Sequence, residues 1–184
     1  MPNKDFFLGR LLDSLDKQTF RDFEVVVTAE GKMAENTNAA IRKSKGELIK
    51  ILYMDDYLAH ENSLQEIVDA WQGGWLVSGC QHDDGVTVGN PHMPTYNSKI
   101  KTGNNTIGSP SVLTIENVYP LLFDEEMSWL LDCDYYHRLY ERFGEPTILP
   151  TLNVNIGIGD HQTTHIMTNE QKLQEHNYIH EKYA

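Results

Sequence analysis

Two adjacent carboxylates, Asp55 and Asp56, directly follow the apolar stretch 48–53, which has the pattern of a buried strand. Two acids at the end of a buried strand are costly unless a positive group meets them. Oxygen ligands of this kind suit Mg²⁺ or Mn²⁺, which bind one or two carboxylates together with substrate phosphates. A solvated turn is the alternative, because acidic pairs are frequent in loops. The residues alone leave both interpretations open.

A second acidic group, Asp132-Cys133-Asp134, stands at the start of a predicted helix over 135–143. An Asp in that position is usually a cap or a partner of the helix dipole. The functional alternative is a general base, a carboxylate that takes a proton from a hydroxyl group. Trp129 lies three residues earlier and could supply an apolar wall that raises the pKa of Asp132. This segment alone does not decide between a cap and a base.

Two of the eight histidines, His161 and His165, follow a glycine-containing turn after a predicted strand over 153–156. A His pair with this spacing on a helix could bind a metal ion. The glycines and Thr163-Thr164 favour a loop instead, and a surface histidine is the more common outcome for each residue.

The elements that must position these groups alternate between helix and strand in the first half of the chain. Such alternation predicts an α/β fold with a mainly parallel sheet covered by helices, in which ligands sit at the carboxyl ends of the strands. Ser63 and Glu66 predict a capping box for one helix, and Thr168 with Gln171 starts another. The expected helices cover 8–15, 38–43, 63–71, 135–143 and 168–184, the expected strands cover 23–27, 48–53, 75–78, 112–115 and 153–156, and 82–108 is a long polar loop.

Composition limits the classes of protein. The 184 residues contain 15 Lys and Arg against 27 Asp and Glu, a formal charge of −12, and 40% of them are apolar. This predicts one soluble globular domain over 1–184 with no nucleic-acid backbone as partner, because tracking that backbone needs a cationic surface. A nucleotide diphosphate remains compatible when a cation meets its charge. The chain has two cysteines, too few for a disulfide framework, and neither a transmembrane segment nor a signal peptide at 1–5 is expected. We therefore expect a cytoplasmic protein.

The order of these motifs resembles the family 2 glycosyltransferases, which have the GT-A fold. Residues 53–56 fall where that family carries its DxD motif and the following acid, and 132–139 match its later acidic motif, whose first carboxylate is the catalytic base. The segment 153–161 resembles the strand that ends in a histidine. Further matches, in chain order, are 12–15, 18–20, 22–27, 38–41 and 44–49.

The resemblance implies an inverting glycosyltransferase of the hexosyltransferase type, using a nucleotide-diphosphate sugar and Mn²⁺ or Mg²⁺. Asp132 would be the catalytic base, and Asp55, Asp56 and His161 would hold the metal ion. Glu30 and Asn38, with Asp55 and Asp56, would bind the donor. Residues 1–80 would form the donor half and 81–184 the acceptor half with the last helix, and the acceptor would be a glycan, a lipid-linked or a protein hydroxyl group.

Three departures from the family pattern keep other functions open. Tyr53 replaces the first Asp of DxD, and Glu30 substitutes for the acid that usually follows the second strand. The family's first strand, which would lie between 23–27 and 48–53, has no counterpart, so we expect these two strands to pair directly or a second copy to supply a strand in a homodimer. The alternatives are a non-catalytic remnant that binds sugar nucleotides and a metal-dependent phosphoesterase or nucleotidyltransferase.

Overall fold

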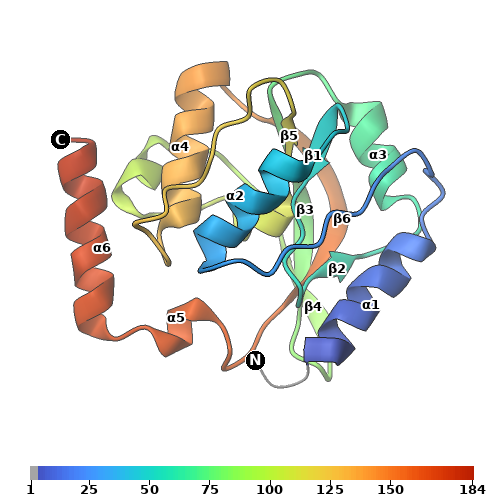
Figure 1. The fold of residues 1–184 in the computed structure, drawn as a ribbon, viewed down its shortest axis with the longest axis horizontal. Helices are drawn as coiled ribbons and strands as arrows, with labels where there is room; N and C mark the ends of the chain where they lie inside the picture. The colour runs from blue at the N-terminus through green and yellow to red at the C-terminus, as the bar shows by residue number, and fades with distance from the viewer. Residues whose placement is uncertain (1–3) are drawn as a thin grey trace.

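A computed structural model describes residues 4–184 and shows a six-stranded sheet in the order β1-β5-β3-β6-β2, with β4 paired to β3 (Figure 1). Only β3 and β6 run parallel, and the other pairs are antiparallel. The expectation of a mainly parallel sheet is therefore corrected: the sheet is mixed. The strands are β1 (Leu48–Lys50), β2 (Tyr57–Leu58), β3 (Trp75–Asp83), β4 (Val88–His92), β5 (Leu113–Glu116) and β6 (Thr147–Gly157).

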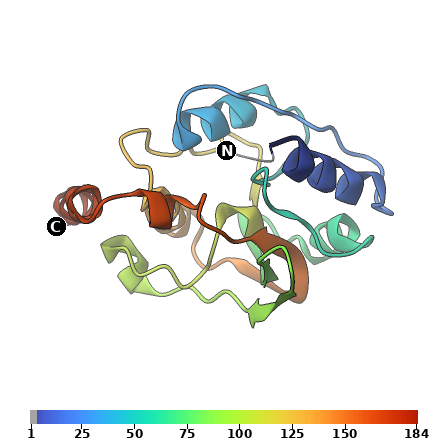
Figure 2. The same ribbon diagram turned by 90° about the horizontal axis from the view of Figure 1, so that it is seen from below.

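Helices lie on and around this sheet. Figures 1 and 2 show α1 and α2 over one face and α6 at the side of the molecule, far from α1. The α-helices are α1 (Lys4–Asp16), α2 (Met33–Lys43), α3 (Ser63–Ala70), α4 (Leu131–Phe143), α5 (Thr163–Ile166) and α6 (Asn169–Lys182); η1 (Ser98–Thr102) and η2 (Pro110–Val112) are 3₁₀ turns. None of these helices, within the part of the chain described, is long and apolar enough to cross a membrane.

The core gathers around β3, whose residues are buried on both faces of the sheet. Trp75 stacks on Tyr136 of α4, with ring centroids 6.1 Å apart, and Tyr96 packs edge-on against Trp75 at 6.3 Å. Aromatic side chains bury more apolar area per residue than other side chains do. This packing fixes α4, which carries the acidic motif, against the central strand.

The predicted strand over 23–27 is wrong. The segment is extended but has no strand partner among the described residues, and the side chains of Val25 and Val27 are 47% and 63% exposed. The carboxylate of Glu24 accepts hydrogen bonds from the backbone N–H groups of Lys45 and Gly46, which holds the segment near the start of β1. A β-branched sequence fits a pleated surface but cannot form a strand without a neighbour. Direct pairing of 23–27 with β1 does not occur, and β1 pairs only with β5. The homodimer expected from the sequence stays a prediction.

The predicted capping box at Ser63 is also wrong. Ser63 is the first residue of α3, its hydroxyl donates to the carbonyl of Asn153 at 3.0 Å, and Glu66 accepts from Thr151 at 2.8 Å. Both side chains therefore attach α3 to β6 instead of capping the helix. The capping box at Thr168 and Gln171 is confirmed.

Several boundaries differ from the expectations. The strand expected over 48–53 ends at Lys50, whereas β3 and β6 extend well beyond the predicted four residues, because their parallel pairing continues to Asp83 and Gly157. The predicted loop over 82–108 contains β4 and η1. Helix α4 starts at Leu131, so Asp132 lies in its first turn.

Candidate active site

Asp55 lies in the turn after β1, and the structure brings it against His161, 106 residues away. The His161 Nε2 atom donates to the Asp55 carboxylate at 2.8 Å, and both side chains are less than one-fifth exposed. Gly157 at the end of β6 packs directly on the carbonyl oxygen of Asp55, leaving no space for a Cβ atom. The close approach of β6 to this turn positions the following loop, and with it His161. His165 lies on α5 and is exposed.

The carboxylate of Asp56 is buried and is bonded by other groups than those of this pair. The Gly157 N–H group donates to one oxygen at 2.8 Å, and the Ser109 hydroxyl lies 3.4 Å from the other. Asp56 is only 2% exposed. Burial, together with the negative charge of Asp55, raises the pKa of Asp56 to about 7. Asp56 therefore ties the turn after β1 to the end of β6 and to Ser109, and its predicted role in metal and donor binding stays a prediction.

Lys50 on β1 is a site residue that the sequence analysis missed. Its Nζ donates to the carbonyl of Ser111 and faces Asp56 from within the protein. Burial lowers the pKa of Lys50 to about 7, although Asp56 acts in the opposite direction. A lysine in the middle of an apolar strand is the signal that could have identified it, because unpaired buried lysines are rare.

We predict that Asp56→Ala lowers the free energy of unfolding by about 1–3 kcal/mol, since it leaves the buried Gly157 N–H without an acceptor. Urea unfolding of the variant measures this loss. Asp56→Asn is the matched control, because its amide oxygen can still accept that hydrogen bond, and it should lose less. Equal stability of Asp56→Ala and the parent would contradict the structural role.

Asp132 lies on the other side of the site, partly buried in the first turn of α4. Its carboxylate accepts a hydrogen bond from the amide of Asn105 at 2.7 Å and one from the N–H of Cys133 at 2.7 Å. Burial raises the pKa of Asp132 to about 6, and these hydrogen bonds limit the increase. A carboxylate with this pKa is about nine-tenths ionised at pH 7, so it can accept a proton there, as a general base must. Its environment therefore supports the base role more than that of a simple cap.

The loop 105–109 connects the two acidic centres. The Asn105 amide that contacts Asp132 also donates to the carbonyl of Gly108 at 3.0 Å, and the next residue, Ser109, reaches Asp56. The Tyr136 hydroxyl donates to the same Gly108 carbonyl at 3.1 Å. Asp132 and the Asp55–Asp56 turn are thus joined by a short chain of hydrogen bonds.

Helix α6 holds the residues that lead into α4 in place. The buried carboxylate of Glu175 accepts hydrogen bonds from the N–H groups of Ser128, Trp129 and Leu130 at 2.8–2.9 Å. An anion at a helix start is favourable because these N–H groups have no partner within the helix. Glu175 was not identified from the sequence, where α6 shows only a polar pattern.

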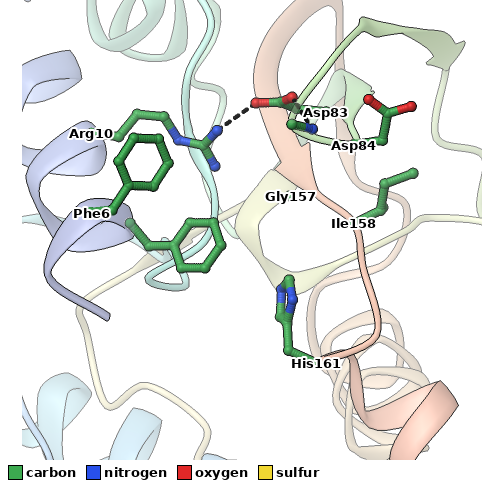
Figure 3. A pocket seen from close by; sticks show the side chains of 9 residues that line it. Phe6, Arg10, Asp83, Asp84, Gly157, Ile158 and His161 are labelled. Atoms are coloured by element: carbon green, nitrogen blue, oxygen red, sulfur yellow. Dashed lines mark hydrogen bonds and ion pairs between the residues drawn. The ribbon is translucent and has the colours of Figure 1, made fainter. Parts of the chain in front are cut away.

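Two cavities border the site. The larger, of about 300 Å³, lies beside the Asp55–His161 pair and is lined by Phe6, Phe7 and Arg10 of α1, by Asp83, and by His161 (Figure 3). The Arg10 guanidinium donates to Asp83 at 2.5 Å and to the carbonyl of Asp55 at 2.7 Å. The smaller, of about 200 Å³, lies beside Asp132. The segment 161–164 contributes His161 to the first cavity and Thr164 to the second.

The other predicted donor-binding residues, Glu30 and Asn38, bond to groups within the protein. Glu30 is exposed and pairs with Lys43 of α2. Asn38 is buried, and its amide bonds the backbone of Phe123 in both directions, at 2.7 and 2.9 Å, and the Glu125 carboxylate at 2.8 Å. Both amide hydrogens of Asn38 are thus bonded within the protein. Asn38, which the sequence analysis predicted to bind the donor, therefore also holds α2 against the segment 123–125.

The donor set at Asp55 fits a cation only in part. No three His, Cys, Asp or Glu side chains within 4–184 are placed to hold a metal ion together. Asp55 and His161 are available, while Asp56 is turned inward and Tyr53 offers only a buried phenol without a hydrogen-bond partner. Such a pair suits Mg²⁺ or Mn²⁺ that takes its remaining ligands from a diphosphate and water. It does not form a preassembled metal cage.

The mixed α/β fold of the chain is shared with several solved structures. Solved structures similar to the chain include TarS from S. aureus, with a TM-score of 0.64 and 17% identity over 86% of this chain and 35% of that one. The structure of TarS residues 1–349 in complex with UDP has a TM-score of 0.64 and 18% sequence identity over 86% of this chain. The complex with UDP-GlcNAc has a TM-score of 0.65 and 16% identity over 96% of this chain. The chain spans 58% and 62% of those two shorter structures. No family model matches the chain, and no curated protein matches it in sequence.

Proposed function

We propose that this chain is an inverting glycosyltransferase that moves a sugar from a nucleotide-diphosphate donor to a hydroxyl group of an acceptor. One observation carries the proposal: Asp132, with a pKa near 6, lies on an open cavity and is joined through 105–109 to the Asp55–His161 centre. The likeness of the fold to TarS, crystallised with UDP and with UDP-GlcNAc, supports this assignment.

In this mechanism the Asp132 carboxylate accepts the proton of the acceptor hydroxyl group as its oxygen attacks the anomeric carbon. The bond between that carbon and the diphosphate oxygen breaks on the opposite face, and the nucleoside diphosphate leaves with the electron pair. A single displacement of this kind inverts the configuration. Asn105 keeps the Asp132 carboxylate oriented, and the hydrogen-bonded loop 105–109 fixes its place relative to Asp55.

A divalent cation at Asp55 and His161 is part of the proposal. When bound, it would neutralise charge that develops on the leaving diphosphate. Asp55 and His161 would orient it, and the inward-facing Asp56 would keep their turn in place. A two-metal phosphoesterase needs several acids that converge on adjacent ions, and no three metal-ligating side chains converge within residues 4–184, which favours the transferase.

The experiment is a thermal-shift panel of UDP- and GDP-sugars with and without Mn²⁺, followed by product analysis. At a donor concentration of 100 Kd, binding contributes about 2.7 kcal/mol, which raises Tm by about 5–10 °C for a chain of this length. We expect one donor to give this shift with Mn²⁺, and its sugar to appear on an acceptor with inverted configuration. Binding without transfer or donor hydrolysis would indicate a non-catalytic remnant, and phosphate-ester cleavage without sugar transfer would indicate a phosphoesterase.

A further inference from the structure

The cavity beside Asp132 is lined by both apolar and polar residues. Trp129 and Leu130 are among them, together with Asp132 and Asn105. Its volume of about 200 Å³ is smaller than the roughly 300–1,000 Å³ of sites for drug-sized ligands. The cavity therefore matches a single ring better than an extended chain.

The Trp129 ring is held in place by several contacts. Its backbone N–H is bound by Glu175 at 2.8 Å, and its indole N–H donates to the Thr164 hydroxyl at 3.2 Å. The His176 ring packs edge-on against it at 5.2 Å, and the Lys172 ammonium lies 5.4 Å from its centroid. A fixed aromatic plane loses little entropy when a ligand packs on it.

From this arrangement we propose that the cavity is the acceptor subsite and that the acceptor is a carbohydrate whose ring packs against Trp129. A pyranose has an apolar C–H face, which suits an indole, and a rim of hydroxyl groups, which suits a carboxylate and an amide. This inference rests on the proposed function, because the hydroxyl group that faces Asp132 would be the one that reacts. It selects the glycan among the glycan, lipid-linked and protein acceptors.

The charge of the cavity supports this selection. No lysine or arginine is among its lining residues, and Asp132 is the one ionisable carboxylate there. A phosphate close to the reacting hydroxyl group, as in a lipid-linked phosphate acceptor, would be repelled by this carboxylate, while the Lys172 ammonium beside Trp129 already donates to the carbonyl of Thr164. An acyl chain would need a longer apolar groove.

The direct test is saturation-transfer NMR of the intact chain with methyl glycosides of glucose, galactose, mannose and N-acetylglucosamine. We expect at least one glycoside to receive saturation, with the strongest effect on the ring hydrogens of one face. Trp129→Ala should weaken its binding about tenfold, and Trp129→Phe should retain most of it. Tyr119→Ala, which removes an aromatic ring that is 86% exposed, is the control and should change nothing.

Donor-side measurements separate this inference from the proposed function. The Tm increase with UDP-GlcNAc and Mn²⁺, and any hydrolysis of that donor, should be equal in Trp129→Ala and in the parent if only the acceptor subsite is altered. Absence of donor binding in both proteins would contradict the proposed function. Donor binding without glycoside binding, equal glycoside binding in Trp129→Ala, or transfer only to peptide or lipid hydroxyl groups would overturn the sugar-acceptor proposal. Melting curves of both Trp129 variants establish that they are folded.

Discussion

Asp132→Asn is expected to lower sugar transfer by about 10²–10⁴-fold, the usual contribution of a general base, while donor binding stays intact. The amide has nearly the shape of the carboxylate, and its single oxygen can still accept one of the two hydrogen bonds that Cys133 and Asn105 donate to separate oxygens of Asp132. It cannot take a proton from the acceptor. Initial rates under saturating donor measure the loss, and the Tm shift with UDP and Mn²⁺ measures donor binding.

The pH dependence of transfer gives an independent reading of the same residue. Burial raises the pKa of Asp132 to about 6, and the base acts only when ionised. The rate should therefore fall below about pH 6, by tenfold per unit once the acid form dominates, whereas an ordinary Asp would give this limb near pH 4. Asp132→Asn should lose the limb. A parent limb near pH 4, or parent rates in the variant, would show that Asp132 is only a helix cap.

Two controls separate chemistry from structure on this helix. Glu126→Gln makes the same acid-to-amide change on an exposed residue close to α4 and should leave transfer unchanged. Asp134 is fully buried and bound by Arg138, Lys182 and Tyr183 at 2.5–2.7 Å. Asp134→Asn should therefore reduce stability, because it removes the buried negative charge that Arg138 and Lys182 pair with, and its effect on the rate should be milder than that of Asp132→Asn.

The sequence predicted most elements that have a complete local signal. The leucine stripe of α1 and the capping box of α6 were correct in type and position, because each is decided within a few residues. The extended segment 23–27 has an equally clear strand pattern but no partner, and partners are a property of the whole sheet. The antiparallel course of β5 beside β3 was likewise invisible to a pattern that only records alternation of helix and strand.

In the site, too, local sequence patterns indicated some residues, and contacts between distant parts of the chain determine the others. Asp55, Asp132 and His161 were identified by their type and order, and the structure places Asp55 against His161. The sequence analysis missed two residues that hold the site in place. Lys50 donates a hydrogen bond to the carbonyl of Ser111 from inside the protein, and Glu175 accepts hydrogen bonds from three backbone N–H groups 45–47 residues away in the sequence. The contacts of Glu175 leave no local pattern, because its partners are far away in the sequence, whereas Lys50 left one signal, a lysine within an apolar stretch. Donor binding by Glu30 and Asn38 stays a prediction, and the structure adds the partners that these side chains find within the protein, Lys43 for Glu30 and Phe123 with Glu125 for Asn38.

Asp55→Ala is expected to abolish the Mn²⁺-dependent part of the Tm increase produced by UDP or GDP, while the variant without ligand melts close to the parent. Asp55 is the one carboxylate of the adjacent pair that is not turned into the protein, so its loss removes the anionic ligand of the proposed cation. Its side chain contacts only His161 through a hydrogen bond, and its carbonyl, which accepts from Arg10, is kept.

The comparison that decides the metal proposal uses four proteins: the parent, Asp55→Ala, His161→Ala and Asp160→Ala. His161→Ala should weaken the Mn²⁺ effect less than Asp55→Ala does, since a neutral imidazole offsets less of the charge of a divalent cation than a carboxylate. Asp160 is exposed beside His161, and its replacement should leave the Mn²⁺ effect unchanged. If Asp55→Ala keeps the full Mn²⁺-dependent shift, the cation binds elsewhere and the Asp55–His161 pair is a structural contact. If Asp160→Ala alone loses it, the cation lies on the outer side of the 158–162 turn, and the donor diphosphate must be placed there as well.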